Sequence, residues 1–293
     1  MSSNIILLKD IQENNLNLTE IILPGGHTPY IISLEFANEL LDAMYLNNQI
    51  HTISLEKQPY INNQFIIKLA DLLSNKSTIT RLSLNSCPLI TNIGIAALAS
   101  MLERNTSLIS LGLSIESLDE ASFNLLSKAL GNNNTLKELE LRNMAIKPNI
   151  EIIKAIANIL KTNTTLTSLH IFEYLVQLDD ISLEMITDAI KYNFHIISLG
   201  NKEYWFEVYS YELHKFLDEP RFQPIRSYLK RNEQIIISSP IQQANMIGSV
   251  KNNTRIVPTL LEVGLFAVKA HIKEGYIQEN MLEQLPLDLK ILF

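Results

Sequence analysis

The sequence holds a single cysteine, Cys87, among its 293 residues. One thiol cannot form an intramolecular disulfide framework or a multi-cysteine zinc site. Glycine and proline are also scarce, at 9 and 10 residues, so the chain is neither collagen-like nor dominated by linkers. With 46% hydrophobic residues and enough length for a large core, the composition favours a globular protein of one or two domains.

Basic residues are outnumbered, with 24 Lys and Arg against 31 Asp and Glu, for a net charge of −7. Binding to nucleic acid or anionic lipid depends on clustered Lys and Arg, so we expect no nucleic-acid partner. No uncharged apolar run is long enough to span a membrane, and residues 1–9 lack the basic region of a Sec signal. Walker, Rossmann, zinc-protease and nucleophile-elbow motifs are missing, so we expect a protein without catalytic residues, metal or cofactor.

An internal repeat occupies the first two thirds of the chain. The pattern Asn-x-x-Leu-x-x-Leu-x-Leu is clearest at 105–113, 133–141 and 163–171. Its first apolar anchor recurs at positions 18, 50, 79, 108, 136, 166 and 196, spaced by 28 to 32 residues. Helical apolar spacing follows the anchors, at 65–73, 92–102, 123–130, 150–160 and 183–190. Each unit is therefore predicted to be a short strand, a turn and a helix, and the units must stack to bury their apolar faces.

The third unit, residues 79–105, resembles the leucine-rich repeat in its long, ribonuclease-inhibitor-type subclass. It carries the expected apolar positions, with Cys87 at the ladder position and Gly94 in the helix. The resemblance covers about residues 15 to 200. It implies an α/β solenoid with parallel strands on the concave face and helices on the convex face.

Two departures from the family pattern predict irregular stacking and a frayed C-terminal edge. The Asn/Cys ladder position is typical only at Cys87, because other repeats carry Gln58, Glu116 or Met144 there. The last repeat has Asn201 in place of its second strand leucine. The Asn-x-Ser/Thr triplets that begin at Asn75, Asn105 and Asn163 are interpreted as turn chemistry rather than glycan sites.

Side chains alternate along a strand, so the residues between the buried leucines face the concave surface. We predict that this face holds a protein partner and that the chain acts as a monomer; a solvated face without a partner is the alternative. The candidate partner-binding residues are Arg81, Ser83, Asn85, Glu138, Glu140, Arg142, Ser168, His170 and Phe172. The paired carboxylates Glu138 and Glu140 and the single imidazole of His170 are interpreted as surface polar groups, not catalytic ones. Cys87 is interpreted as structural.

The repeat pattern ends near residue 203, which predicts two domains, a solenoid at 1–203 and a small α-helical domain at 204–293. Helices are expected around 209–217, 225–230, 242–250 and 257–272. The plain interpretation is a helical cap over the last repeat.

Segment 256–293 resembles a SOCS box, in which an apolar helix binds Elongin C and a Leu-Pro segment approaches a cullin. The positions that would make these contacts are Thr259, Leu260, Gly264 and Val268 in the helix, then Leu285, Pro286 and Leu289. This resemblance implies Elongin B/C and a cullin as partners.

In composition and architecture the chain is similar to the leucine-rich-repeat effectors that bacteria such as Legionella deliver into host cells. That resemblance implies a bacterial cytoplasmic origin, then the host cytosol. Two alternatives remain open. A GTPase-activating protein of the Ran type would use Arg81 and Asn85, and a hydrolase in the tail would use Glu262, His271 and Glu274.

Overall fold

The computed structural model describes residues 2–23, 31–114, 119–142, 149–171, 175, 178–199 and 220–237. The chain divides into two compact units, Met1–Arg226 and Ser227–Phe293, and each is described by itself. The domain boundary expected near residue 203 falls within 200–219, outside the described residues, so it stays a prediction. In the part of the chain that is described, no helix has the length and apolar character needed to cross a membrane.

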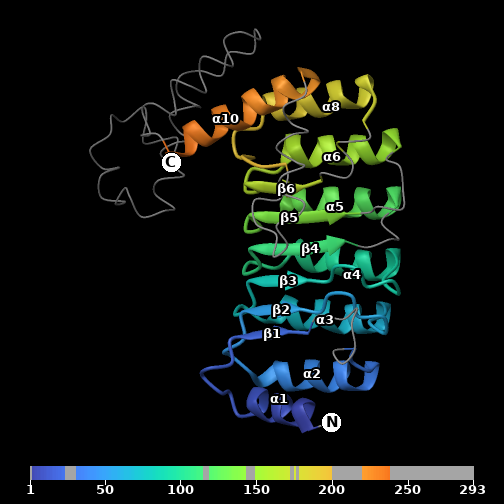
Figure 1. The fold of residues 1–293 in the computed structure, drawn as a ribbon, viewed down its shortest axis with the longest axis vertical. Helices are drawn as coiled ribbons and strands as arrows, with labels where there is room; N and C mark the ends of the chain where they lie inside the picture. The colour runs from blue at the N-terminus through green and yellow to red at the C-terminus, as the bar shows by residue number, and fades with distance from the viewer. Residues whose placement is uncertain are drawn as a thin grey trace, which may run out of the picture. The chain divides into compact units, whose positions relative to one another are not determined.

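One parallel sheet runs through the first unit, and its strands follow each other in sequence order. The strands are β1 (Glu20–Ile22), β2 (Thr52–Ser54), β3 (Arg81–Ser83), β4 (Ser110–Ser114), β5 (Glu138–Arg142) and β6 (Ser168–His170). In Figure 1 they are stacked beside a column of helices, so each repeat adds one strand and one helix. This arrangement is an α/β solenoid of the leucine-rich-repeat type, as the sequence predicted.

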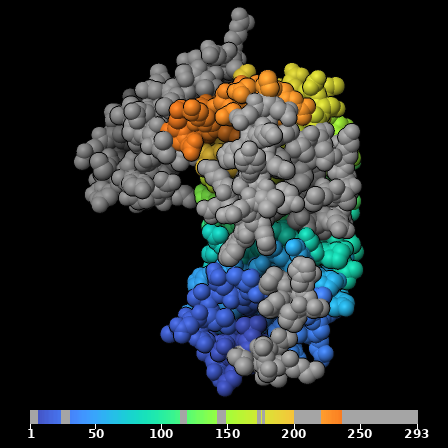
Figure 2. All heavy atoms as spheres, viewed as in Figure 1, coloured from blue at the N-terminus to red at the C-terminus, as the bar shows by residue number. Residues whose placement is uncertain are grey.

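The described helices of the solenoid pack against their neighbours in the chain. They are α1 (Ser2–Gln12), α2 (Leu34–Leu46), α3 (Asn63–Asn75), α4 (Asn92–Leu102), α5 (Glu120–Asn132), α6 (Ile150–Thr162) and α8 (Asp180–Lys191). The five predicted helical segments all lie within α3 to α8, which confirms them. Figure 2 shows the same order in the colours left uncovered, from blue through cyan to yellow.

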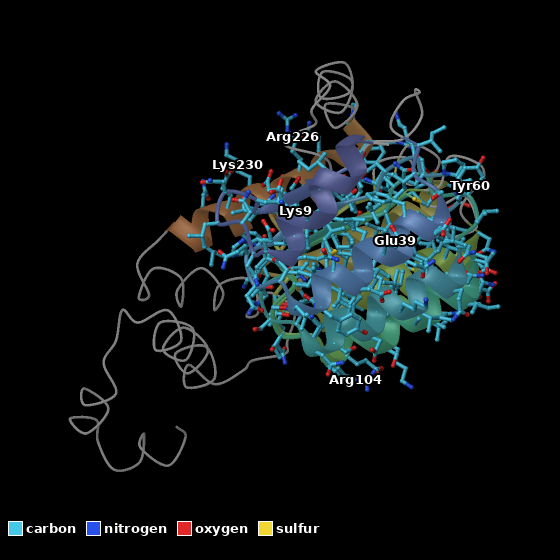
Figure 3. All side chains as sticks on the ribbon, turned by 90° about the horizontal axis from the view of Figure 1, so that it is seen from below. Lys9, Glu39, Tyr60, Arg104, Arg226 and Lys230 are labelled. Atoms are coloured by element: carbon cyan, nitrogen blue, oxygen red, sulfur yellow. The ribbon has the colours of Figure 1, made fainter. Side chains whose placement is uncertain are left out.

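The helix α1 was not predicted, and α2 is the helix of the first repeat, whose bounds the sequence analysis did not give. In Figure 3, which views the stack from its N-terminal end, α1 with Lys9 lies alongside α2 with Glu39. The side chain of Ile11 is fully buried, so α1 covers the apolar end of the first repeat. Solenoids require such a cap, because their terminal repeats have no neighbour on one side.

The inner face of the sheet forms the core. Ile53, Leu82, Leu111, Leu139 and Leu169 are paired in register across β2 to β6, and all are 2% exposed or less. Burying a leucine side chain contributes about 2 kcal/mol, so this row is a main source of stability.

Helix starts are fixed by side-chain caps, and at α4 the cap comes from another repeat. Asn62, Asp119, Asn149 and other N-cap residues accept hydrogen bonds from amides of their own first turn. The hydroxyl of Thr91 does not. Instead Oδ1 of Asn63, on α3, accepts from the amides of Thr91 and Gly94 at 2.9 and 3.1 Å.

Gly94 is required by this close approach. A Cβ atom at Gly94 would lie 2.8 Å from Oδ1 of Asn63 and 2.9 Å from a methyl of Ile90. Glycine therefore serves here to let the side chains of Asn63 and Ile90 approach the backbone of α4, rather than to adopt an unusual dihedral angle.

The turns after α2, α4, α5, α6 and α8 are each closed by a buried asparagine, a feature we name the asparagine ladder (Asn47, Asn105, Asn133, Asn163 and Asn193). In Asn133, for example, Nδ2 donates to the carbonyl of Leu102 at 2.7 Å, while Oδ1 accepts from the amides of Thr135 and Leu136. This is the first asparagine of the repeat pattern. It also confirms the interpretation of the Asn105 and Asn163 triplets as turn chemistry, since both side chains are buried in such turns.

A second set of buried polar side chains lies just after the strands, at the family's Asn/Cys position. The irregular stacking predicted from Gln58 at this position was wrong. Gln58 is fully buried; its Nε2 donates to the carbonyl of Leu23 and its Oε1 accepts from the amide of Ile32. Gln58 thus makes the hydrogen bonds to the preceding repeat that Asn or Cys is expected to make at this position. The longer side chain does not interrupt the stack there. Cys87 occupies the next position, and the thiol donates to the carbonyl of Leu55. Glu116 and Met144 lie outside the described residues.

The seventh repeat ends the sheet weakly, as predicted. In its described part, residues 193–199, the pairing with β6 is reduced to an isolated bridge between Ser168 and Ser198. Asn201 itself lies outside the described residues.

Beyond the solenoid repeats, a 3₁₀ turn (Pro220–Phe222) leads into α10 (Gln223–Ile237). Phe222 is fully buried, and a guanidinium nitrogen of Arg221 donates to the carbonyl of Leu178 at 3.2 Å, within the first unit. The helix expected at 225–230 is confirmed and is longer than predicted. Those expected at 209–217, 242–250 and 257–272 lie outside the described residues.

Candidate functional site

The sheet face opposite the buried leucine row, which we call the concave face after the family geometry it is expected to share, carries two rows of side chains that cross the strands. Register places Glu20, Thr52, Arg81, Ser110, Glu138 and Ser168 in the first row, and Ile22, Ser54, Ser83, Gly112, Glu140 and His170 in the second. Neighbouring strands are about 4.8 Å apart, so each row presents one side chain at that interval. This confirms the predicted alternation of residues between core and concave face.

Most of the candidate partner-binding residues are thereby brought onto one surface. Arg81 is exposed, and Ser83, Glu138, Glu140, Ser168 and His170 are partly exposed. For Arg142 the structure gives the backbone position, beside Ser114 on β4. Phe172 lies outside the described residues.

Asn85 holds a different position from the other candidates. It lies just past β3, its side chain is only 9% exposed, and Nδ2 donates to Oε2 of Glu140 at 3.4 Å. The contact joins β3 to β5 across the intervening strand. Of the two residues that the GTPase-activating hypothesis needs, Arg81 is presented to solvent, whereas Asn85 is engaged within the sheet face.

Gly112 on β4 makes room for this contact. A Cβ atom there would lie 3.2 Å from both Nδ2 of Asn85 and Oγ of Ser83, closer than side chains usually pack. Ser83 in turn donates to Oε1 of Glu56 at 2.6 Å. The middle of the face therefore carries only small side chains. Beside it, the carboxylates of Glu56 and Glu140 accept hydrogen bonds from the neutral side chains of Ser83 and Asn85.

Glu56 was missed by the sequence analysis. It lies two residues after Ser54, as Asn85 lies two residues after Ser83, so the repeat register could have placed it on the same surface. Glu56, Glu138 and Glu140 outnumber Arg81 among the described side chains of the central strands. Among the described side chains, the face therefore carries carboxylates on and near β5 and β2 and a guanidinium on β3.

Among the described residues, no three His, Cys, Asp or Glu side chains come close enough together to bind a metal ion. Cys87 is buried beneath the strand-to-helix turn rather than on the face. Burial raises the pKa of its thiol to about 11, so the reactive thiolate is disfavoured at neutral pH.

The remaining candidates belong to the C-terminal segment. Thr259, Leu260, Gly264, Val268, Leu285, Pro286 and Leu289 all lie outside the described residues, as do Glu262, His271 and Glu274. The SOCS-box resemblance and the hydrolase alternative therefore stay predictions.

Comparison with known proteins gives little beyond the fold. No protein-family model matches the chain, and no curated protein matches it. One solved structure to which it is similar is that of "Leiomodin-1 Actin-Binding Site 2 (ABS2)", with a TM-score of 0.44 and 21% identity. The match covers 53% of this chain and 86% of that one. The solenoid class is established by the strand order and register of this chain.

Proposed function

We propose that this chain is a non-catalytic protein-binding module that holds a partner protein on its concave face. The observation that supports the proposal is the aligned sheet face, whose exposed and half-exposed side chains come from five successive strands in fixed register. A rigid array of this kind loses little conformational entropy on binding, because the backbone that positions it is already ordered.

The charges on the face suggest the chemistry of the partner. Glu138 and Glu140 lie two residues apart on β5 and point to the same side, so they would pair with a Lys or Arg of the partner. Arg81, two strands away, would pair with a carboxylate. Small residues between them, Ser110 and Gly112, allow the partner's backbone to approach the sheet.

Affinity capture from host-cell lysate, followed by mass spectrometry, tests this proposal. Ser110→Arg places a bulky cation at the centre of the concave face, and Ser100→Arg places the same group on an exposed position of α4. We expect Ser110→Arg to lose the captured protein and Ser100→Arg to retain it. Loss in both variants, or in neither, would contradict the concave face as the binding surface.

We further propose that the module works as a bacterial effector inside a host cell and that segment 256–293 recruits Elongin B/C and a cullin. The support for this is the sequence resemblance alone. Deleting residues 256–293 should abolish capture of Elongin B/C while the protein held by the solenoid is retained. If the full chain does not bind purified Elongin B/C, the adaptor role is wrong and the segment is better explained as a cap.

A further inference from the structure

The junction between α2 and α3 differs from the other helix junctions in the described part of the solenoid. At the others, a ladder asparagine donates to the last turn of the preceding helix at 2.7 to 2.9 Å, through a buried bond. Asn47 joins α2 to α1 in this way, and Asn105 joins α4 to α3. Asn133, Asn163 and Asn193 join the later pairs.

Lys76 takes the place of asparagine in the turn after α3. Its ammonium donates to the carbonyl of Asn47 at 2.5 Å and to Oδ1 of Asn48 at 3.1 Å. An ammonium has three donors and no acceptor, so it cannot accept from the amides two and three residues later, as each ladder asparagine does.

The following residues show the effect of this substitution. Neither the amide of Thr78 nor that of Ile79 has a hydrogen-bond acceptor among the described residues. The hydroxyl of Thr78 is likewise buried without a partner there, whereas the matching hydroxyl of Thr135 donates to the carbonyl of Asn105. A buried hydroxyl without a partner is destabilising, which weakens this turn.

The helices α2 and α3 also make two side-chain contacts with each other on the surface. The hydroxyl of Tyr45 donates to Oδ2 of Asp71 at 2.7 Å, and Nζ of Lys68 donates to Oδ1 of Asn38 at 2.9 Å. Both bonds are exposed and compete with water, so they contribute little. The α2–α3 junction therefore lacks the buried asparagine bond found at the other junctions, although Lys76 reaches Asn47 and Gln58 reaches Ile32 across the same repeat boundary.

We propose that α1 and α2 form an N-terminal block that opens from the solenoid at the α2–α3 junction as a unit of local unfolding. The block stays together because the Asn47 bond to Ile11 lies inside it. It is directly linked to β1, which carries Glu20 and Ile22 at one end of the concave face. Opening would thus change that end of the face while β3 to β6 keep their arrangement. The proposal does not depend on which partner the face binds.

Hydrogen–deuterium exchange on the full 293-residue chain, read by mass spectrometry, tests this block. In the wild type, amides of α1 and α2 should exchange together and faster than those of α5 and α6. Lys76→Asn supplies the missing acceptor and should slow exchange in α1 and α2 by about tenfold, as expected for one or two recovered hydrogen bonds. Lys161→Asn, an exposed lysine of α6 outside the ladder, is the control and should change nothing in α1 or α2.

A reciprocal variant separates this account from ordinary fraying of a chain end. Asn105→Lys removes the bond from Asn105 to Leu73, so α3 should join the fast-exchanging block while α5 and α6 stay protected. The proposal is overturned if Lys76→Asn leaves exchange in α1 and α2 unchanged, or slows α5 and α6 equally. It is also overturned if Asn105→Lys leaves α3 as protected as before.

Discussion

The turns that follow the helices, which we call the turn edge, and the concave face repeat with the same period. They differ in how much the residue at a given repeat position varies. At the turn edge, four of the five turns from residue 76 to residue 193 place a buried asparagine in the same set of hydrogen bonds. On the concave face, the same register positions hold Arg81, Ser110, Glu138 and Ser168. The first set specifies the fold, and the second is chemically varied and available for recognition.

The largest contrast is expected between a core position and its concave neighbour on β4. Leu111→Ala removes a side chain that is 1% exposed, and should lower the free energy of unfolding by about 3–4 kcal/mol. Ser110→Ala, one residue earlier and on the opposite side of the strand, should change it by less than about 0.5 kcal/mol. Urea denaturation followed by circular dichroism measures both. Equal effects would mean that the sheet faces are not divided into core and surface.

A second contrast is pH-dependent and concerns the last turn of the ladder. His195 lies two residues after Asn193, and burial, with a smaller effect from Lys137, lowers its pKa from 6.5 to about 4. The folded state therefore disfavours the protonated ring. The neutral ring therefore contributes to the free energy of unfolding above pH 6.5. This contribution, on the order of 2–3 kcal/mol, is lost as the pH falls toward 4.

His195→Thr should flatten this pH dependence, since Thr135 and Thr165 occupy the same repeat position without a titrating group. Urea midpoints measured between pH 7 and 4 for the two proteins give the comparison. A variant that loses stability with the same slope as the wild type would show that His195 is not responsible.

Within the turn edge, a buried asparagine should matter far more than its exposed neighbour. Asn133→Ala removes donors to Leu102 and Asn105 and leaves two amides without an acceptor, so unfolding free energy should fall by about 2 kcal/mol. Asn134→Ala removes only an exposed local contact and should cost less than about 0.5 kcal/mol. Similar losses in both variants would argue against the ladder as a source of stability.

The smallest stability effect is expected on the concave face itself. Glu138→Gln combined with Glu140→Gln keeps the side-chain shapes and should change unfolding free energy by less than about 0.5 kcal/mol. The same variant should weaken binding of a captured partner, which titration calorimetry would show as a lower affinity and a smaller salt dependence. If binding is unchanged, Glu138 and Glu140 are not part of the recognition surface.

The sequence predicted the repeating part well, because each repeat buries apolar residues at the same positions. Strand register, the helices α3 to α8 and the concave rows all follow from that pattern. It failed where the pattern is interrupted. The helix α1 belongs to no repeat, and Gln58 reaches the ladder bonds with a longer side chain than the family pattern uses.

The contacts on the concave face were beyond what spacing can predict. The bond between Asn85 and Glu140 depends on Gly112, which lies on the strand between them. Such a contact links residues two repeats apart, so no pattern within one repeat contains it. The weak α2–α3 junction was visible in principle, since Lys76 stands where the other turns have asparagine.

The central claim is that the concave face holds a partner protein. Its most direct test is site-specific photocrosslinking of the full chain in host-cell lysate. A photoreactive amino acid at position 110 would report on the concave face, and one at position 100 on the convex face. The account predicts a covalent adduct with a discrete host protein from position 110 and none from position 100. An adduct that forms from position 100 but not from position 110 would contradict it.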